Sequence, residues 1–249
     1  MSEQKSLVTI LMTNYNYGRF IEYAVKSVVA QTYSPLEVIV VDDGSTDNSR
    51  EVVEDLEKRY RYRFVNFKIL PLKPNNGVNA ALNRGIPLIE GDVTIIFDSD
   101  DFLFAQYVEK TTSVLLENKS QGVGFVYPDN VLIDEHENLL RDKDGKLIVR
   151  PFKDFDAELL QKDSYIPGCG ATLTDALKAV WPLDPTIRKG TKHERLKGMV
   201  AKGYTGRRIS KPLFYYRLHD DNNSGIGRRV FSAVSSGEPV GEFSQYWTS

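Results

Sequence analysis

The chain has 249 residues, of which 41% are hydrophobic and 27% charged, an ordinary composition for a globular protein. Its 32 basic and 34 acidic residues give a net charge of -2, which gives no argument for nucleic-acid binding, where a strongly basic face is expected, so no nucleic-acid partner is predicted. One cysteine, Cys169, excludes an intrachain disulfide and favours a reducing, cytoplasmic setting.

Strand-like and helix-like patterns alternate over the first part of the chain. Continuous apolar runs predict buried strands at residues 7–13 and 36–41, and further strands are predicted at 64–70 and 93–97. Apolar residues at helical spacing predict helices at 20–29, from the mid-40s to about Tyr60, and at 78–90, where Pro87 kinks or ends the helix. This alternation is typical of a mostly parallel α/β sheet with right-handed crossovers.

The pattern changes after residue 105. Helices are predicted at 107–116, 155–162, 174–180 and 192–202, and strands at 124–134, 205–209 and 213–218, with a hairpin at 139–149. We therefore divide the chain into residues 1–105, residues 106–224 of the same domain, and a tail at 225–249 that is flexible or forms a lid.

Polar clusters follow three of the predicted strands, at residues 13–16, 42–45 and 98–101. Because ligands of open α/β sheets bind beyond the carboxyl ends of the strands, we expect these clusters to lie together. Asp98, Asp100 and Asp101 are three carboxylates within four residues, and their mutual repulsion costs stability unless a cation or hydrogen bonds compensate it. Such oxygen ligands favour Mg²⁺ or Mn²⁺. The alternative is a solvated turn in which Asp98 caps a helix. Asp43 is either a ribose or base ligand or part of a turn.

The joint pattern resembles family 2 glycosyltransferases, which have the glycosyltransferase A-type fold. Order and spacing match over about the first 105 residues. The segments that carry the resemblance are VTILMTNYN at 8–16, SVVAQTY at 27–33, VVDDGSTD at 40–47, Asn76-Gly77, ALNRG at 81–85, Gly91-Asp92 and FDSDD at 97–101.

The resemblance implies roles for the residues of these segments. It implies that residues 1–105 bind the nucleotide sugar and that residues 106–224 form an acceptor-side, catalytic lobe. Donor-nucleotide contacts then fall on Thr13, Tyr15, Asp43, Asp98 and Asp100.

The same resemblance implies a divalent metal, Mn²⁺ or Mg²⁺, bound to the diphosphate. Its ligands fall on Asp100, with Asp101 as an additional ligand. The segment from Tyr215 to His219 resembles a later family element and places His219 beside the metal or diphosphate. Otherwise His219 is a strand-end histidine that bonds a loop.

The second half departs from the family at one point. Relatives carry an acidic pair at the start of a late helix, ahead of a Gly-Tyr pair that matches Gly203-Tyr204. Thr191-Lys192 stands where the acidic pair is expected, and Glu194 is the nearest carboxylate. We assign Glu194 as the catalytic base, with a first-turn helix acid as the alternative.

These assignments predict a metal-dependent inverting transfer from a nucleoside diphosphate sugar, by resemblance a UDP sugar. The expected acceptor is a hydroxyl of a saccharide or lipid-linked molecule in polysaccharide or glycoconjugate synthesis. A catalytically impaired sugar-nucleotide-binding or scaffold protein of the same fold is the alternative. An oxidoreductase would need Gly-x-Gly-x-x-Gly after the first strand, and residues 13–18 lack it. With no signal-peptide pattern and no apolar run of about 20 residues, we expect a cytoplasmic protein, soluble or peripheral at the inner face of the membrane.

Overall fold

The computed structural model describes residues 5–219, and its first half is built on four parallel strands. They are β1 (Val8–Asn14), β2 (Leu36–Asp42), β3 (Asn66–Pro71) and β4 (Val93–Asp98), in the spatial order β3-β2-β1-β4. Every residue of β2 is buried, as its continuous apolar run predicts for a strand covered on both faces.

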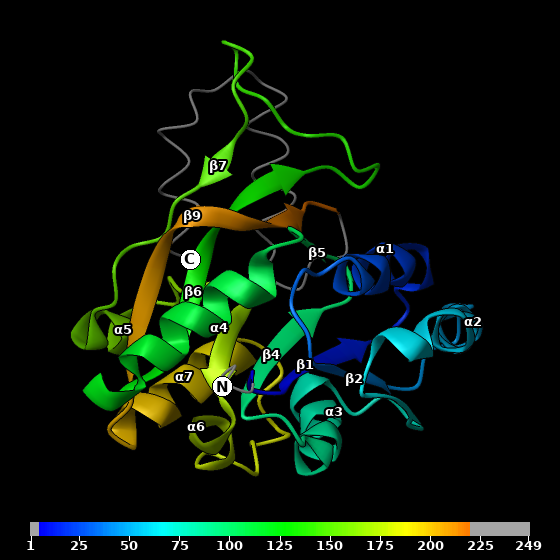
Figure 1. Cartoon of the computed structure of the whole chain (residues 1–249), viewed down its shortest axis with the longest axis horizontal. Helices are drawn as coiled ribbons and strands as arrows, with labels where there is room; N and C mark the ends of the chain where they lie inside the picture. Colours follow the sequence, from blue (N-terminus) through cyan, green and yellow to red (C-terminus); the bar gives the residue numbers. More distant parts are fainter. Residues whose placement is uncertain (1–4, 220–249) are drawn as a thin grey trace.

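Helices connect these strands and cover both faces of the sheet. α1 (Gly18–Val29) and α2 (Ser49–Tyr60) lie on one side of β1 and β2, and α3 (Val78–Gly85) lies on the other (Figure 1). This placement follows from right-handed crossovers once the strand order reverses between β3 and β4. The carboxyl ends of β1, β2 and β4 therefore meet at one edge of the sheet, where the strand order reverses.

The sheet continues through the second half, so that the described residues form one nine-stranded sheet. Beyond β4 it runs through β8 (Gly170–Leu173), β6 (Val123–Ile133), β9 (Thr205–Arg217) and β5 (Phe102–Leu103), and β7 (Val149–Arg150) pairs with β6. β8 is antiparallel to both β4 and β6, whereas β9 runs parallel to β6. The predicted mostly parallel α/β fold is confirmed in the first half, with antiparallel pairs added in the second.

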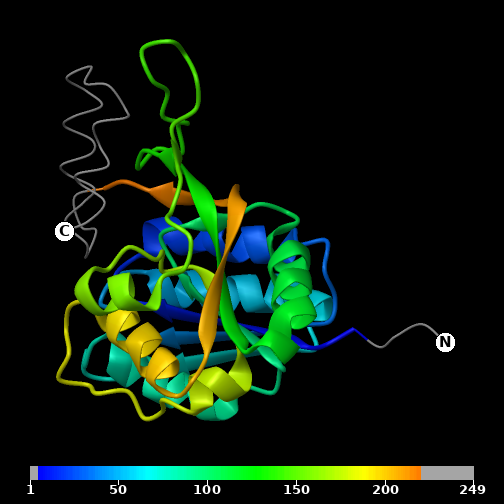
Figure 2. The same ribbon diagram turned by 90° about the vertical axis from the view of Figure 1, so that its left-hand side faces the viewer.

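Four further helices pack around this second half. α4 (Tyr107–Asn118) lies on one side of β6 and β9, and α5 (Ala157–Lys162) and α7 (Thr191–Ala201) lie on the other (Figure 2). α6 (Thr174–Lys178) follows β8 directly. Residues 134–148 extend away from the body of the domain between β6 and β7 (Figure 2). Within residues 5–219, no helix is long and apolar enough to cross a membrane.

Two predictions have wrong element boundaries and one strand was not predicted, each for a local physical reason. The helix predicted at 78–90 ends at Gly85, and a 3-10 turn at Ile86–Leu88 accommodates Pro87. The two strands predicted at 205–209 and 213–218 are one strand, β9, because its pairing with β6 continues across a bulge near Pro128 and Asp129. β8 was not predicted at all, since its four residues begin with a glycine and bury only two side chains. The predicted tail at 225–249 lies outside the described residues.

Candidate functional site

The first two polar clusters are joined by hydrogen bonds at the carboxyl edge of the sheet. Asn14, buried at the end of β1, donates from Nδ2 to Asp42 Oδ2 at 2.9 Å and to Ser45 Oγ at 3.2 Å. Asp42 also accepts hydrogen bonds from the Ser45 N–H and hydroxyl, at 2.9 and 2.6 Å. The backbone N–H of Asn16 donates to Ser45 Oγ at 2.9 Å. Asp42 is therefore used to hold the two loops together.

Asp43 is the carboxylate that faces the turn ahead of α3. Its Oδ2 accepts hydrogen bonds from the backbone N–H groups of Asn76 and Gly77, at 3.2 and 2.7 Å. Burial raises the pKa of Asp43, while these two N–H groups and the charge of Arg188 oppose the rise. Arg188 packs on Gly77, whose φ of +87° and crowded α-carbon favour glycine. Asp43 is thus held rigidly beside a cation that the sequence pattern did not single out.

Thr13 is the second-to-last residue of β1, and Tyr15 directly follows the strand. Thr13 is half-buried and pairs in register with Val41 of β2 and Asp98 of β4. Tyr15 leaves 44% of its surface exposed, so its ring is available to pack on a planar ligand. The three predicted clusters therefore do meet at one edge.

The loop after β4 is held by the end of β9. Arg217, fully buried, donates from Nε to the carbonyl oxygen of Asp100 at 2.7 Å, and its backbone N–H donates to Asp101 Oδ1 at 2.9 Å. Its guanidinium also forms an ion pair with Glu137 and lies 4.5 Å from the centre of the Phe20 ring. Arg217 therefore fixes the position of both aspartates from a strand more than a hundred residues later.

Asp100 and His219 approach each other across this loop. His219 Nε2 lies 3.1 Å from Asp100 Oδ2, and its ring packs against Tyr17 and Phe20. Asp101, by contrast, is 3% exposed, and burial together with the charge of Asp100 raises its pKa well above the usual range. Among residues 5–219, no three histidine, cysteine or acidic side chains are grouped closely enough to hold a metal ion by themselves.

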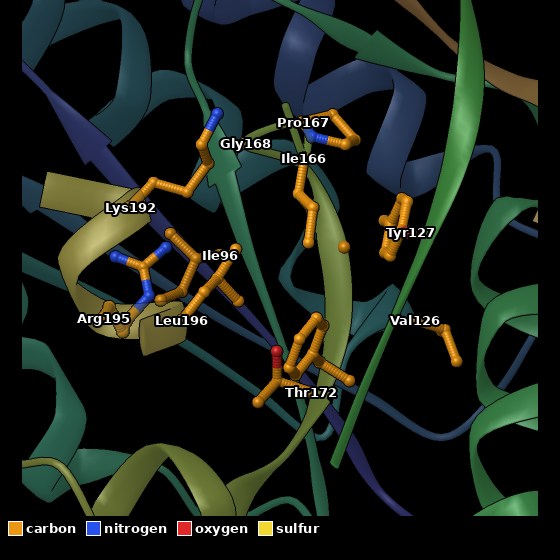
Figure 3. A pocket seen from close by; sticks show the side chains of 12 residues that line it. Ile96, Val126, Tyr127, Ile166, Pro167, Gly168, Thr172, Lys192, Arg195 and Leu196 are labelled. Atoms are coloured by element: carbon orange, nitrogen blue, oxygen red, sulfur yellow. The ribbon is translucent and has the colours of Figure 1, made fainter. Parts of the chain in front are cut away.

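Two cations line a pocket next to Asp98, on the side of β4 away from β1. Gly168 lies so close to Asp98 that an added Cβ would be 3.0 Å from Asp98 Oδ2 and 3.9 Å from Lys192 Cδ. Lys192 and Arg195, both on α7, line the pocket opposite Tyr127 of β6 (Figure 3). Although Asp98 reaches solvent, surrounding protein atoms desolvate its carboxylate, and this effect with the charge of Asp100 raises the pKa of Asp98 to about 6.

The predicted base lies outside this pocket. Glu194 is exposed in the first turn of α7, where its carboxylate pairs with Lys197 at 3.1 Å, and it does not line the pocket. Helical geometry explains this, since a residue two positions after Lys192 points about 200° around the helix from it. Lys192 and Arg195 take the inward positions instead.

Cys169 sits behind the pocket and takes part in packing. It is 2% exposed, its Sγ donates to Tyr107 Oη at 3.2 Å, and burial raises the pKa of its thiol well above the usual range. A thiol that is buried and protonated is unreactive, so the structure gives this cysteine a packing role.

Comparison with known proteins agrees with this geometry. Residues 9–181 match the sequence profile described as glycosyl transferase family 2. The chain belongs to glycosyl transferase family 2. An uncharacterised glycosyltransferase, alr2836 of Nostoc sp., is 29% identical over 221 residues, which are 87% of this chain and 66% of the relative. A Campylobacter jejuni enzyme named GalNAc(5)-diNAcBac-PP-undecaprenol beta-1,3-glucosyltransferase is 29% identical over 159 residues, 63% of this chain and 46% of that enzyme. The chain thus spans at most two thirds of these two relatives.

Two solved glycosyltransferase structures have a fold similar to that of this chain. The mannosyltransferase PcManGT of Pyrobaculum calidifontis, solved with GDP-Man and Mn²⁺, aligns with a TM-score of 0.66 at 16% identity, over 98% of this chain and 68% of that one. Residues 1–349 of TarS from S. aureus, solved with UDP, align with a TM-score of 0.63 at 17% identity, over 96% of this chain and 69% of that one. At this identity the likeness establishes the glycosyltransferase A-type fold alone.

Proposed function

We propose that this family 2 glycosyltransferase chain binds a nucleoside diphosphate sugar, with UDP as the nucleotide, and transfers the sugar to a hydroxyl of a saccharide or lipid-linked acceptor. The observation that carries the proposal is the meeting of Thr13, Asp43, Asp98 and Asp100 at the edge where the strand order reverses. The UDP complex of the TarS fragment supports UDP as the donor nucleotide. The name of the Campylobacter relative includes an undecaprenyl diphosphate-linked saccharide, which supports a lipid-linked acceptor. Such a transfer belongs to polysaccharide or glycoconjugate synthesis, in the cytoplasm or at its membrane face.

The residues present fit a divalent metal at one end of this site. Asp100 offers a carboxylate oxygen and His219 an imidazole nitrogen 3.1 Å away, a pair of donors that suits Mn²⁺ or Mg²⁺ when diphosphate oxygens complete the set. Asp101, predicted as an additional ligand, has one oxygen engaged by the Arg217 N–H. When bound, such a metal would offset charge on the departing nucleoside diphosphate. Asp98 and Asp43 would orient the ribose and base by accepting hydrogen bonds.

Calorimetric titration of UDP, GDP and TDP, each with and without Mn²⁺, tests the proposed donor site. We expect UDP to bind, and to bind more tightly with Mn²⁺, because Asp100 would hold a metal whose charge attracts the diphosphate. Preferential binding of GDP or TDP would change the nucleotide that we assign to the site but would still support a donor site at this place. Failure of all three nucleotides to bind would contradict the donor site itself.

The assignment of Glu194 as base is tested by Glu194→Gln. If Glu194 removes the acceptor proton, this change keeps UDP affinity and lowers the rate of UDP release from a UDP sugar and acceptor panel by at least ~100-fold. Lys197→Ala is the matched control, because it removes the partner of Glu194 and leaves the carboxylate in place. A near-normal rate in Glu194→Gln rules the assignment out.

One observation favours a second candidate function, a sugar-nucleotide-binding protein without turnover. Lys192 occupies the inward position of α7 beside Asp98, where the family resemblance implies an acidic pair. This reading predicts tight UDP binding with no transfer to any acceptor hydroxyl. Detection of UDP release that depends on an added acceptor would exclude it.

A further inference from the structure

The pocket beside Asp98 has a cationic wall. Lys192 and Arg195 lie one turn apart on α7, so both side chains reach the same pocket, which β6, β8 and the segment from Ile166 to Gly168 enclose (Figure 3). The positive end of the α7 dipole adds to this charge, because both residues are in the first turns of the helix.

Arg195 is buried without a partner that would explain its charge. It is 8% exposed, and within residues 5–219 it forms no hydrogen bond or ion pair with another side chain or with the backbone. The same holds for Lys192, which is half-buried. Buried charges in proteins are normally paired, so an unpaired guanidinium aimed into a pocket indicates a ligand of opposite charge.

Asp98 does not balance these cations. Among the described residues, Asp98 is the one carboxylate whose charge acts to raise the pKa of both Lys192 and Arg195. It lies outside ion-pair distance of either side chain. The pocket therefore carries excess positive charge.

We propose that Lys192 and Arg195 bind an anionic group, a carboxylate or a phosphate, carried by the acceptor sugar. The inference rests on the proposed transferase function and names the class of acceptor that this site takes. Arg195 offers a planar fork of N–H donors that matches either anion in a bidentate manner, and Lys192 adds a mobile point charge.

The position of the pocket assigns it to the acceptor and not to the donor nucleotide. The loops that follow β1 and β2 lie on one side of β4, whereas Tyr127, Thr172 and α7 lie on the other. Asp98, at the end of β4, stands between the two sides. An acceptor held by its anionic group in this pocket would thus face the donor sugar across Asp98.

Calorimetry with glucuronate, glucose 6-phosphate and glucose tests the inference, on the whole chain saturated with UDP and Mg²⁺. Both anionic sugars, or one of them, should bind, and neutral glucose should bind at least ~10-fold more weakly, as expected for loss of a charge-assisted contact. Comparison of the two anionic sugars separates a carboxylate from a phosphate. The same titrations without UDP measure the affinity of the anion site on its own, so the inference is tested even if the chain does not bind UDP.

Matched variants assign the effect to the two side chains. Lys192→Gln and Arg195→Gln should each weaken the anionic sugar at least ~10-fold while UDP affinity and the circular dichroism spectrum stay unchanged. Lys197→Ala, on the same helix but outside the pocket, should leave the anionic sugar unaffected. Equal binding of glucose, no binding of either anionic sugar, or unchanged affinity in folded Lys192→Gln would overturn the inference.

Discussion

Replacing Asp100 with alanine is expected to reduce UDP affinity in Mn²⁺ to the value measured without metal, and to lower turnover at least ~100-fold. Asp100 Oδ2 is the oxygen that faces His219 Nε2 at 3.1 Å, so the change removes the carboxylate that we propose as the metal ligand. The backbone carbonyl that Arg217 uses to hold this loop remains in alanine. The loop should therefore keep its position, and the loss should be one of metal binding.

The control for this change is an aspartate that pairs elsewhere on the surface. Asp55→Ala removes a carboxylate from α2 that forms an exposed pair with Arg59, and exposed pairs of this kind contribute little to stability. Calorimetry of both variants with UDP, with and without Mn²⁺, measures the difference. Metal-dependent UDP binding that survives in Asp100→Ala would refute the proposed metal role.

Replacing Arg217 with alanine is expected to reduce the free energy of unfolding by about 3–5 kcal/mol, the usual effect of breaking a buried charge network from one side. The change removes the bond to the Asp100 carbonyl and leaves Glu137 without its partner. It also removes the cation from the Phe20 ring. Because the loop after β4 loses its anchor, UDP affinity should fall in the folded fraction as well.

Urea unfolding followed by circular dichroism measures this effect against two companions. Arg217→Lys keeps the charge but cannot reproduce the planar fork, so it should recover only part of the stability. Arg207→Ala, which changes an exposed arginine on the same strand, should cost about 1 kcal/mol or less. A loss under about 1 kcal/mol in Arg217→Ala would show that the buried guanidinium is not the anchor.

The meeting of the polar clusters at one edge of the sheet was predictable because the evidence for it is local. Continuous apolar runs mark β1, β2 and β4, and the chain places its polar residues directly after them. Parallel strands then bring these residues to one edge by topology alone. The prediction needed no knowledge of side-chain packing.

The pocket beside Asp98 was not predictable, because its lining depends on how the surrounding elements are rotated. α7 has only Leu196 and Met199 as buried apolar residues, so its sequence does not specify which face turns inward, and Lys192 and Arg195 take it in place of Glu194. Arg217 looked like an ordinary strand residue, since nothing local indicates that its partners are Asp100 and Asp101. β8 has only four residues and begins with a glycine, so it gives no strand pattern.

The attachment of the Asp98–Asp101 loop to the end of β9 has a consequence for how the protein folds. The bonds from Arg217 to Asp101 and from His219 to Asp100 close sequence separations of 116 and 119 residues, the kind of non-local contact that forms late. A ribosome that has released only the first half of the chain has released the loops that we propose contact the nucleotide, without the residues that hold the aspartate loop in place. Competence to bind a metal-nucleotide complex should therefore arise in one step, when the final strand of the sheet pairs.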